Sequence, residues 1–219
     1  MLFLFVSWLY GCSTTQIHSS VQFEDISLSP TGLSTHGLAF ITPSTVTGRE
    51  QDTQSLAFIF ADVMHKQRPD IKVVSLAETL SAINLAGIAD EYKKMYFDYS
   101  DTGIFKKDAL RIVGEATGAR YLAQLKLSSF NQYSKGRFSF LGIRMVQTRE
   151  ANIRLFLQIW NSELGAIAWE GTEELNYAWD TTREKPVTFK LVVEEIARNL
   201  ISKLPQDAST ASAGATRTD

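Results

Sequence analysis

Cysteine is almost absent from this sequence, since Cys12 is the only one among 219 residues. One thiol cannot form an intramolecular disulfide or a site with several thiolate ligands, so a packed core has to stabilise the fold. The three histidines, His18, His36 and His65, lack the paired spacing of metal ligands. We therefore expect neither a metal site nor a cofactor.

An excess of charge of one sign is also missing. The chain has 22 Lys and Arg residues against 24 Asp and Glu residues, which gives a formal net charge of -2. This balance gives no electrostatic reason to bind nucleic acid, and we expect no DNA or RNA partner. The hydrophobic share of 44% is ordinary for a single globular domain.

Catalytic motifs are scarce as well. The run from Gly114 to Gly118 lacks the lysine of a phosphate-binding loop and precedes a strand, and no Gly-x-Ser-x-Gly elbow occurs. The adjacent glutamates Glu173 and Glu174 should point in different directions on a strand, so they do not form a converging acid/base pair. We expect a protein that is not an enzyme. An enzyme stays an alternative because catalytic residues can lie far apart in the sequence.

The first eleven residues form an uncharged apolar run that ends at Cys12. The run is too short to cross a bilayer as a helix, and it has the length of a signal-peptide apolar region. With Leu9, Gly11 and Cys12 it resembles a bacterial lipoprotein signal, in which the tetrad ends Leu-x-Gly-Cys. The resemblance implies cleavage between Gly11 and Cys12, acylation of Cys12, and, with Ser13 next, an outer-membrane location facing the periplasm. The alternative is an apolar terminal strand or helix with a buried thiol.

Composition divides the chain into four parts. Residues 1–11 are expected to be the signal peptide, and residues 12–36, rich in Ser, Thr and Gln, a flexible tether behind the lipidated cysteine. Residues 37–204 are expected to form the folded domain. Residues 205–219 have almost no bulky apolar side chain and are expected to be a disordered tail.

Hydrophobic periodicity predicts a single domain of the α/β (α+β) class, with a mixed sheet of about five strands and helices packed on it. The expected order is β-α-β-α-α-α-β-β-β-α. Strands are expected at about 37–43, 71–76, 121–128, 152–160 and 166–171, and helices at about 50–66, 76–83, 88–99, 106–117 and 187–204. The last three strands should form an antiparallel meander. The expected core includes Phe60, Val74, Ile112, Leu125, Leu155, Leu157, Trp169, Val193 and Ile196.

This order resembles the periplasmic domain of the curli-secretion lipoprotein family, whose relatives include activators of penicillin-binding proteins. The local sequences that carry the resemblance are Gly118–Leu122, Ile153–Trp160, Glu163–Gly165 and Ile167–Gly171. It covers roughly residues 38–204 and implies an anticodon-binding-domain-like fold. Where relatives have glycine after the Tyr-Leu pair, this chain has Gln124.

Residues 128–150 interleave aromatic and basic side chains, as interaction surfaces do. Two shapes are open for this segment, a protruding hairpin or a loop folded over the core. The candidate partner-binding residues are Phe130, Tyr133, Lys135, Arg137, Phe138, Phe140 and Arg144.

Three functions follow from these observations. The leading one is a non-enzymatic outer-membrane lipoprotein, held to the membrane by its lipid anchor, that binds or regulates another envelope protein. The second is a homo-oligomeric secretion pore, as the family resemblance implies. The third is an envelope enzyme.

Overall fold

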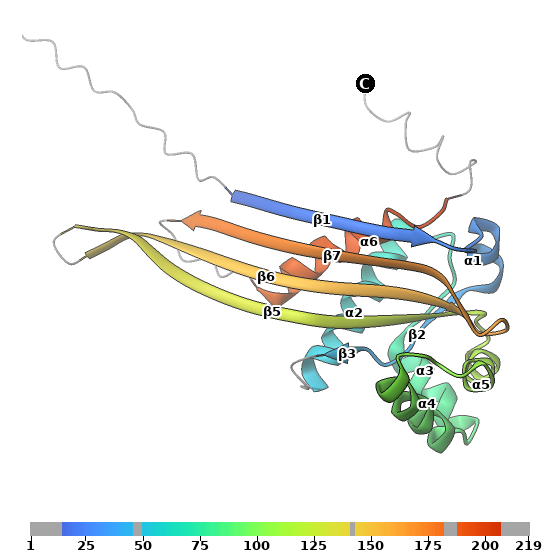
Figure 1. Cartoon of the computed structure of the whole chain (residues 1–219). Coiled ribbons are helices and arrows are strands. Elements are labelled where there is room, and N and C mark those ends of the chain that lie inside the picture. Colours follow the sequence, from blue (N-terminus) through green and yellow to red (C-terminus); the bar gives the residue numbers. More distant parts are fainter. Residues whose placement is uncertain (1–14, 46–49, 141–142, 182–187, 207–219) are drawn as a thin grey trace, which may run out of the picture.

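Long antiparallel strands dominate the structure (Figure 1). The computed structural model describes residues 15–45, 50–140, 143–181 and 188–206, and for 15–17, 130–140, 143–151 and 177–181 it describes the backbone only. The strands within these residues are β1 (Thr15–Asp25), β2 (Leu38–Phe40), β3 (Ser44–Thr45), β4 (Val73–Val74), β5 (Tyr121–Phe140), β6 (Ile143–Asn161) and β7 (Ala166–Thr181). They form one sheet in the order β1-β7-β6-β5-β2-β4, with β3 beside β5.

The sheet is mixed. β5, β6 and β7 form an antiparallel meander, as the sequence predicts, and β1 adds to β7 antiparallel. The short strand β2 pairs in parallel with β4 on one side and β5 on the other, and β3 also pairs in parallel with β5. The fold class is confirmed, but the sheet has seven strands in the described residues instead of about five.

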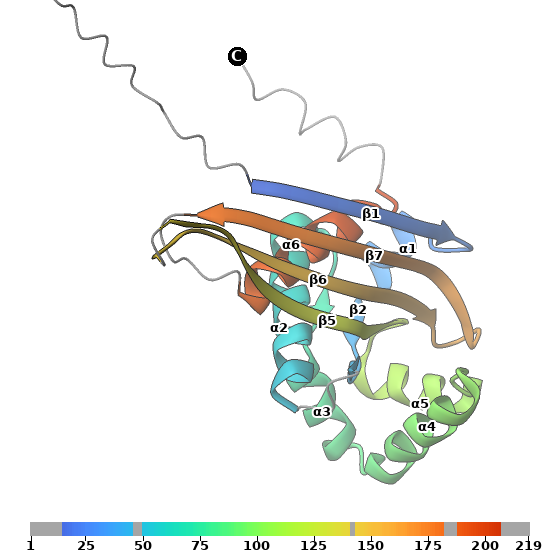
Figure 2. The same cartoon turned by 60° about the vertical axis from the view of Figure 1, so that its left-hand side comes forward.

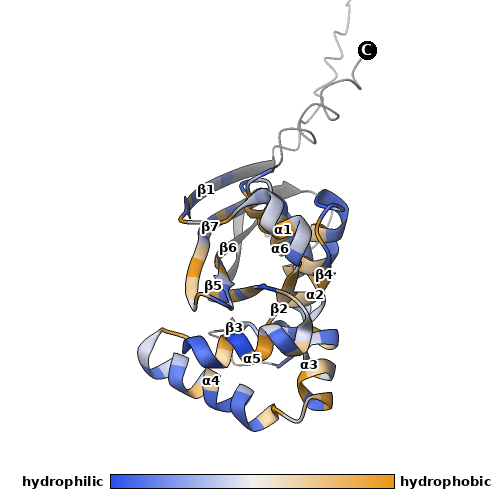
Figure 3. Ribbon diagram, turned by 90° about the vertical axis from the view of Figure 1, so that its right-hand side faces the viewer, coloured by the Kyte–Doolittle hydropathy of each residue, from blue (hydrophilic) through white to orange (hydrophobic). Residues whose placement is uncertain are grey.

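Helices cover both faces of the sheet near β2. They are α1 (Pro30–His36), α2 (Glu50–Gln67), α3 (Leu76–Leu85), α4 (Ala89–Thr102), α5 (Lys107–Thr117) and α6 (Phe189–Ile201). One apolar cluster joins α1, α2 and α6 to the meander, and a second joins α4, α5 and the end of α3 to β2 and to the base of β5. Figures 2 and 3 show the two groups of helices apart from each other.

Local signals set several helix ends. Ser75 and Glu78 form the expected capping box at the start of α3, because each side chain accepts a hydrogen bond from the backbone N–H of the other. α5 ends at Gly118, which adopts φ of 65°, a left-handed conformation that costs little only for glycine. These signals are local, which is why the sequence predicts them well.

Among the sequence predictions, the flexible tether agrees least with the structure. Residues Thr15–Asp25 are β1, and Pro30–His36 are α1, which Ser29 caps by accepting a hydrogen bond from the N–H of Gly32. The prediction of a flexible segment over 12–36 is therefore wrong for these residues. The polar composition of β1 hides the strand because its order comes from pairing with β7 and not from local propensity.

The expected core is correct for most of its members. Phe60, Leu125, Leu155, Leu157, Trp169, Val193 and Ile196 are buried. Val74 and Ile112 are only half-buried. On α5 the buried face is formed by Leu110, Val113 and Gly114, so Ile112 lies at the side of this face and not at its centre.

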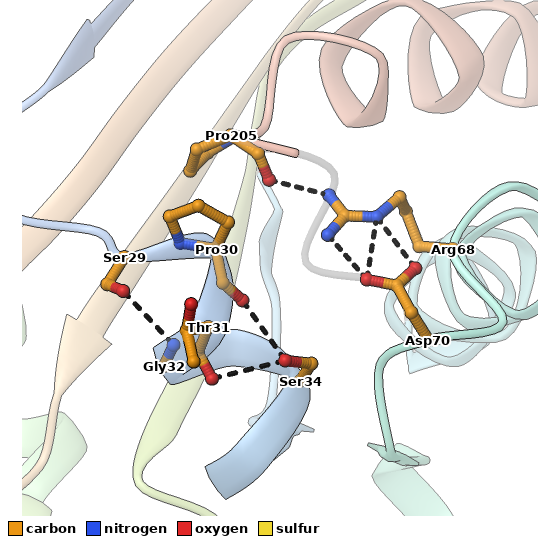
Figure 4. A network of polar contacts seen from close by, with 8 residues as sticks. All are labelled: Ser29, Pro30, Thr31, Gly32, Ser34, Arg68, Asp70 and Pro205. Carbon is orange, nitrogen blue, oxygen red and sulfur yellow. Dashed lines mark hydrogen bonds and ion pairs between the residues drawn. The ribbon is translucent and has the colours of Figure 1, made fainter. Parts of the chain in front are cut away.

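The end of the folded chain is fixed by a buried arginine at the end of α2 (Figure 4). Arg68 donates from Nε and Nη2 to the carboxylate of Asp70 and from Nη1, at 3.0 Å, to the carbonyl of Pro205. The hydrogen bond and charge of Arg68 lower the pKa of Asp70. The expected disordered tail lies outside the described residues beyond Gln206, as do the signal peptide, Gly11 and Cys12.

Candidate functional site

The segment 128–150 is neither a separate loop nor folded back. It is the outer half of a hairpin formed by β5, of 20 residues, and β6, of 19 residues. β7 accompanies β6 only as far as the pair Gln147↔Thr181, whereas the hairpin continues to Phe140↔Ile143. The end of the hairpin thus projects beyond β7 and beyond the helices (Figure 1).

One edge of this hairpin is open in the described part of the chain. β2 and β3 pair with β5 only up to Leu127, so from Ser128 to Phe140 β5 pairs with β6 alone. Register shifts occur between Leu127 and Ser129 and again around Gly136 and Phe138. Such irregularities bend a strand and increase its twist, and they are common where a sheet edge has a function.

The seven candidate residues lie along the outer half of the hairpin. Their described backbone pairs are Phe130↔Ile153, Tyr133↔Glu150, Lys135↔Thr148, Phe138↔Val146, Phe140↔Ile143 and Ser139↔Arg144. Arg137 lies at the register shift between Gly136 and Phe138. At about 3.3 Å per residue, Phe130 and Phe140 are roughly 30 Å apart along β5. The residues therefore form a strip and not a compact patch.

The base of the hairpin carries polar pairs on one face of the sheet. Arg154 of β6 donates to the carboxylate of Glu174 of β7, and the Asn152 amide donates to Glu174 and to the side-chain oxygen of Asn176. The hydrogen bond from Arg154 is the main reason why the pKa of Glu174 is lowered. The Gln158 amide donates to Glu170 in the same way.

The opposite face holds a buried carboxylate. Glu173 is 0% exposed, and its Oε1 accepts hydrogen bonds from Ser19 Oγ at 2.7 Å and Asn199 Nδ2 at 2.8 Å. Burial raises the pKa of Glu173. Glu173 and Glu174 thus point in opposite directions, as alternation predicts, and they do not act as a pair.

Gln124 also has a structural role. Its amide donates to Ser44 Oγ at 3.1 Å, and its oxygen accepts from Tyr96 Oη at 3.3 Å. Tyr96 in turn donates to the carbonyl of Thr42 at 2.8 Å. This partly buried network joins α4 to β3 and β5.

Sequence reasoning missed two further surfaces. The first is the outer edge of β1, where Thr15–Phe23 has no Lys, Arg, Asp, Glu or Pro to protect it. The second is an apolar groove beside Phe58 and Leu80. The sequence could have indicated this groove, because Phe58 is a large apolar residue that lies outside the buried face of α2.

The described residues show no group of three or more His, Cys, Asp or Glu side chains placed to hold a metal ion. His18, His36 and His65 are on β1, α1 and α2. Within the same residues, no helix is long and apolar enough to cross a membrane.

No family model and no curated protein matches this sequence. Among solved structures, the chain is similar to a PelC dodecamer from Paraburkholderia phytofirmans, with 13% identity, a TM-score of 0.48, and coverage of 85% of this chain and 94% of that one. It is also similar to lipoprotein GNA1162 from Neisseria meningitidis, with 9% identity, a TM-score of 0.39, and coverage of 76% and 99%. Similarity at this level carries no information about function. Neither neighbour is named as a curli-secretion protein or as an activator of penicillin-binding proteins, so the resemblance to the curli-secretion family stays a prediction.

Proposed function

We propose that this chain is a non-enzymatic, lipid-anchored protein of the bacterial outer membrane that binds an extended segment of another envelope protein along its β5–β6 hairpin. The observation that carries this proposal is the edge of β5 from Ser128 to Phe140, which is open within the described residues and belongs to a hairpin that projects beyond the body. The anchor at Cys12 and the envelope location rest on the sequence motif.

An extended partner suits this site better than a compact one. A strip roughly 30 Å long can contact a strand or an unfolded segment over its whole length. A strand added to an open edge gains main-chain hydrogen bonds, and side chains at alternate positions give specificity. Lys135 and Arg137 lie on β5 and would favour a segment with acidic side chains.

A shortened hairpin tests the proposal. Joining Tyr133 to Glu150 through Asn-Gly removes residues 134–149, and Asn-Gly suits a two-residue turn between paired strands. The shortened and the full-length proteins are purified by affinity from solubilised envelopes. We expect the full-length protein to retain a partner that the shortened one loses, while both melt in the same range. Retention of the same partner by the shortened protein would contradict the proposal.

A second candidate is self-association of the chain. The sheet has open edges on opposite sides, at β1 and at outer β5, in the described residues. β5, β6, β7 and β1 alternate in direction, so β1 of one copy would be antiparallel to β5 of the next. Such head-to-tail pairing generates a ring when it closes.

A further inference from the structure

An apolar groove lies between three helices, away from the projecting hairpin. The first half of α2, the start of α3 and the start of α6 form its walls around a volume of about 910 Å³. This volume is within the range of about 300–1,000 Å³ that is typical of small-molecule sites. The lining residues are Gln54, Ser55, Phe58, Ile59, Ser75, Leu76, Ala77, Leu80, Thr188, Phe189 and Lys190.

Large apolar side chains remain exposed in this groove. Phe58 is 73% exposed and Leu80 is 42% exposed, although their neighbours Ile59 and Leu76 are buried. Each exposed side chain leaves apolar area in contact with water that an apolar ligand would cover. The groove thus has an unfilled apolar surface next to a filled core.

The ionisable lining of the groove is positively charged. Lys190 is the only ionisable residue among the described lining residues, and the other polar ones, such as Ser55 and Thr188, are neutral. Its Nζ is 3.6 Å from the half-buried Glu194, and this long ion pair leaves the Lys190 side chain 71% exposed. The nearby carboxylate of Glu78 accepts hydrogen bonds from Ser75 N and Oγ, so it is engaged in capping α3.

One helix end adds to this charge. α6 begins at the groove with Thr188 as its N-cap, whereas the N-terminus of α3 is already occupied by the Glu78 carboxylate. The N-terminus of a helix carries a partial positive charge that favours anions. Together with Lys190, it makes a singly charged anionic group the best match for the polar end of the groove.

We propose that this groove binds a long-chain fatty carboxylate. The alkyl chain contacts Phe58, Leu76 and Leu80, and the carboxylate lies at Lys190 near the N-terminus of α6. One cation balances one negative charge, which favours a carboxylate over a doubly charged phosphate head. This site is independent of the hairpin and of its partner.

Calorimetric titration of the full chain carrying Cys12→Ser tests this assignment without a covalent lipid that could compete. The probes are dodecanoate, dodecyltrimethylammonium and dodecyl maltoside, which share an alkyl chain and differ in head charge, all below their micelle-forming concentrations. We expect saturable binding with dodecanoate the tightest. Decanoate should bind roughly tenfold more weakly, because two fewer methylenes are buried.

Matched variants locate the site. Leu80→Glu should abolish binding, whereas Leu85→Glu, on the same helix but outside the groove, should not change it. Lys190→Glu should weaken dodecanoate binding roughly three- to tenfold and favour the cationic probe, while Lys203→Glu should do neither. Thermal unfolding followed by circular dichroism checks that each variant is folded.

Three results would overturn the proposal. They are equal affinity for the three head groups, equal effects of Leu80→Glu and Leu85→Glu, or no saturable binding of dodecanoate. Dissociation of a dimer by Leu80→Glu without any dodecanoate binding would assign the groove to a second copy of the chain instead.

Discussion

Trp169 lies over Gly171 on the same strand, with Phe23 of β1 stacked against its ring at 6.2 Å between centroids. A Cβ atom at Gly171 would overlap the indole ring. Trp169 is fully buried, so the ring has little room to move. The glycine therefore provides the space for the largest side chain of the core.

Replacing Gly171→Ala should lower the free energy of unfolding by about 1–3 kcal/mol, because the core is overpacked at this point. Urea unfolding measures the change, with Thr172→Ala on the next residue as the control. In a Trp169→Leu background the same alanine should cost less, because the smaller side chain leaves room for the new methyl group. An equal cost in both backgrounds would show that the ring is not what Gly171 accommodates.

Glu173 makes the stability depend on pH in an unusual direction. Burial is the main cause of its raised pKa, and the nearby Glu195 adds to it, against the hydrogen bonds from Asn199 and Ser19. The folded protein then holds the proton more tightly than the unfolded chain does. The stability contributed by this group is fully present below the ordinary carboxyl pKa and is lost as pH rises through the raised value.

Glu173→Gln mimics the protonated carboxyl group, so it should be more stable than the unsubstituted protein at pH 7. This gain should shrink as pH falls towards about 4. Glu174→Gln is the matched control: the lowered pKa of Glu174, caused mainly by the hydrogen bond from Arg154, means that this substitution removes stability at pH 7, and this loss should also shrink at low pH. Urea unfolding at several pH values measures both differences. A gain at Glu173→Gln that does not vary with pH would contradict the assignment.

At the scale of the elements, the sequence predicts well what local chemistry determines. The capping box at Ser75 predicts the start of α3 correctly, and the alternation from Ile153 to Ile159 predicts the inner half of β6. β1 is missed because its residues are polar and its order comes from the neighbouring strand β7. For 128–150 the sequence leaves a protruding hairpin and a loop folded over the core as alternatives, because only the pairing of β5 with β6 decides between them. The strip of candidate residues could be located from its aromatic and basic composition. That it runs along an open sheet edge could not be predicted from the sequence.

The open edge of β1 gives a prediction for the second candidate function. Ser20 and Gln22 are exposed on β1, and lysines on an edge strand oppose pairing with another chain. Ser20→Lys with Gln22→Lys should convert a self-associated protein into monomers, as measured by sedimentation velocity. Gln67→Lys with Ser81→Lys adds the same charge on helices and should leave the mass unchanged. Equal behaviour of the two pairs would exclude pairing through β1.

At the scale of the whole molecule, the two groups of helices stabilise one end of a sheet whose other end projects as the hairpin (Figure 2). The core side chains therefore lie at one end of the long strands, and the projecting hairpin residues lie at the other end. Changes at the tip should alter binding without altering stability, whereas changes such as Leu157→Ala should cost about 2–5 kcal/mol. The groove beside Phe58 could not be predicted, because it needs three helices that are distant in sequence.

The most direct test of the central claim is charge reversal at the tip of the hairpin. Arg137→Glu with Arg144→Glu should weaken binding to the partner found by affinity purification, mainly through slower association at low salt, while the free energy of unfolding stays the same. Association and dissociation rates are measured against the unsubstituted protein and against Arg111→Glu with Arg198→Glu on α5 and α6, which reverses the same charge away from the hairpin. The account predicts that only the hairpin pair slows association by several-fold. Equal association rates for the two pairs would contradict it.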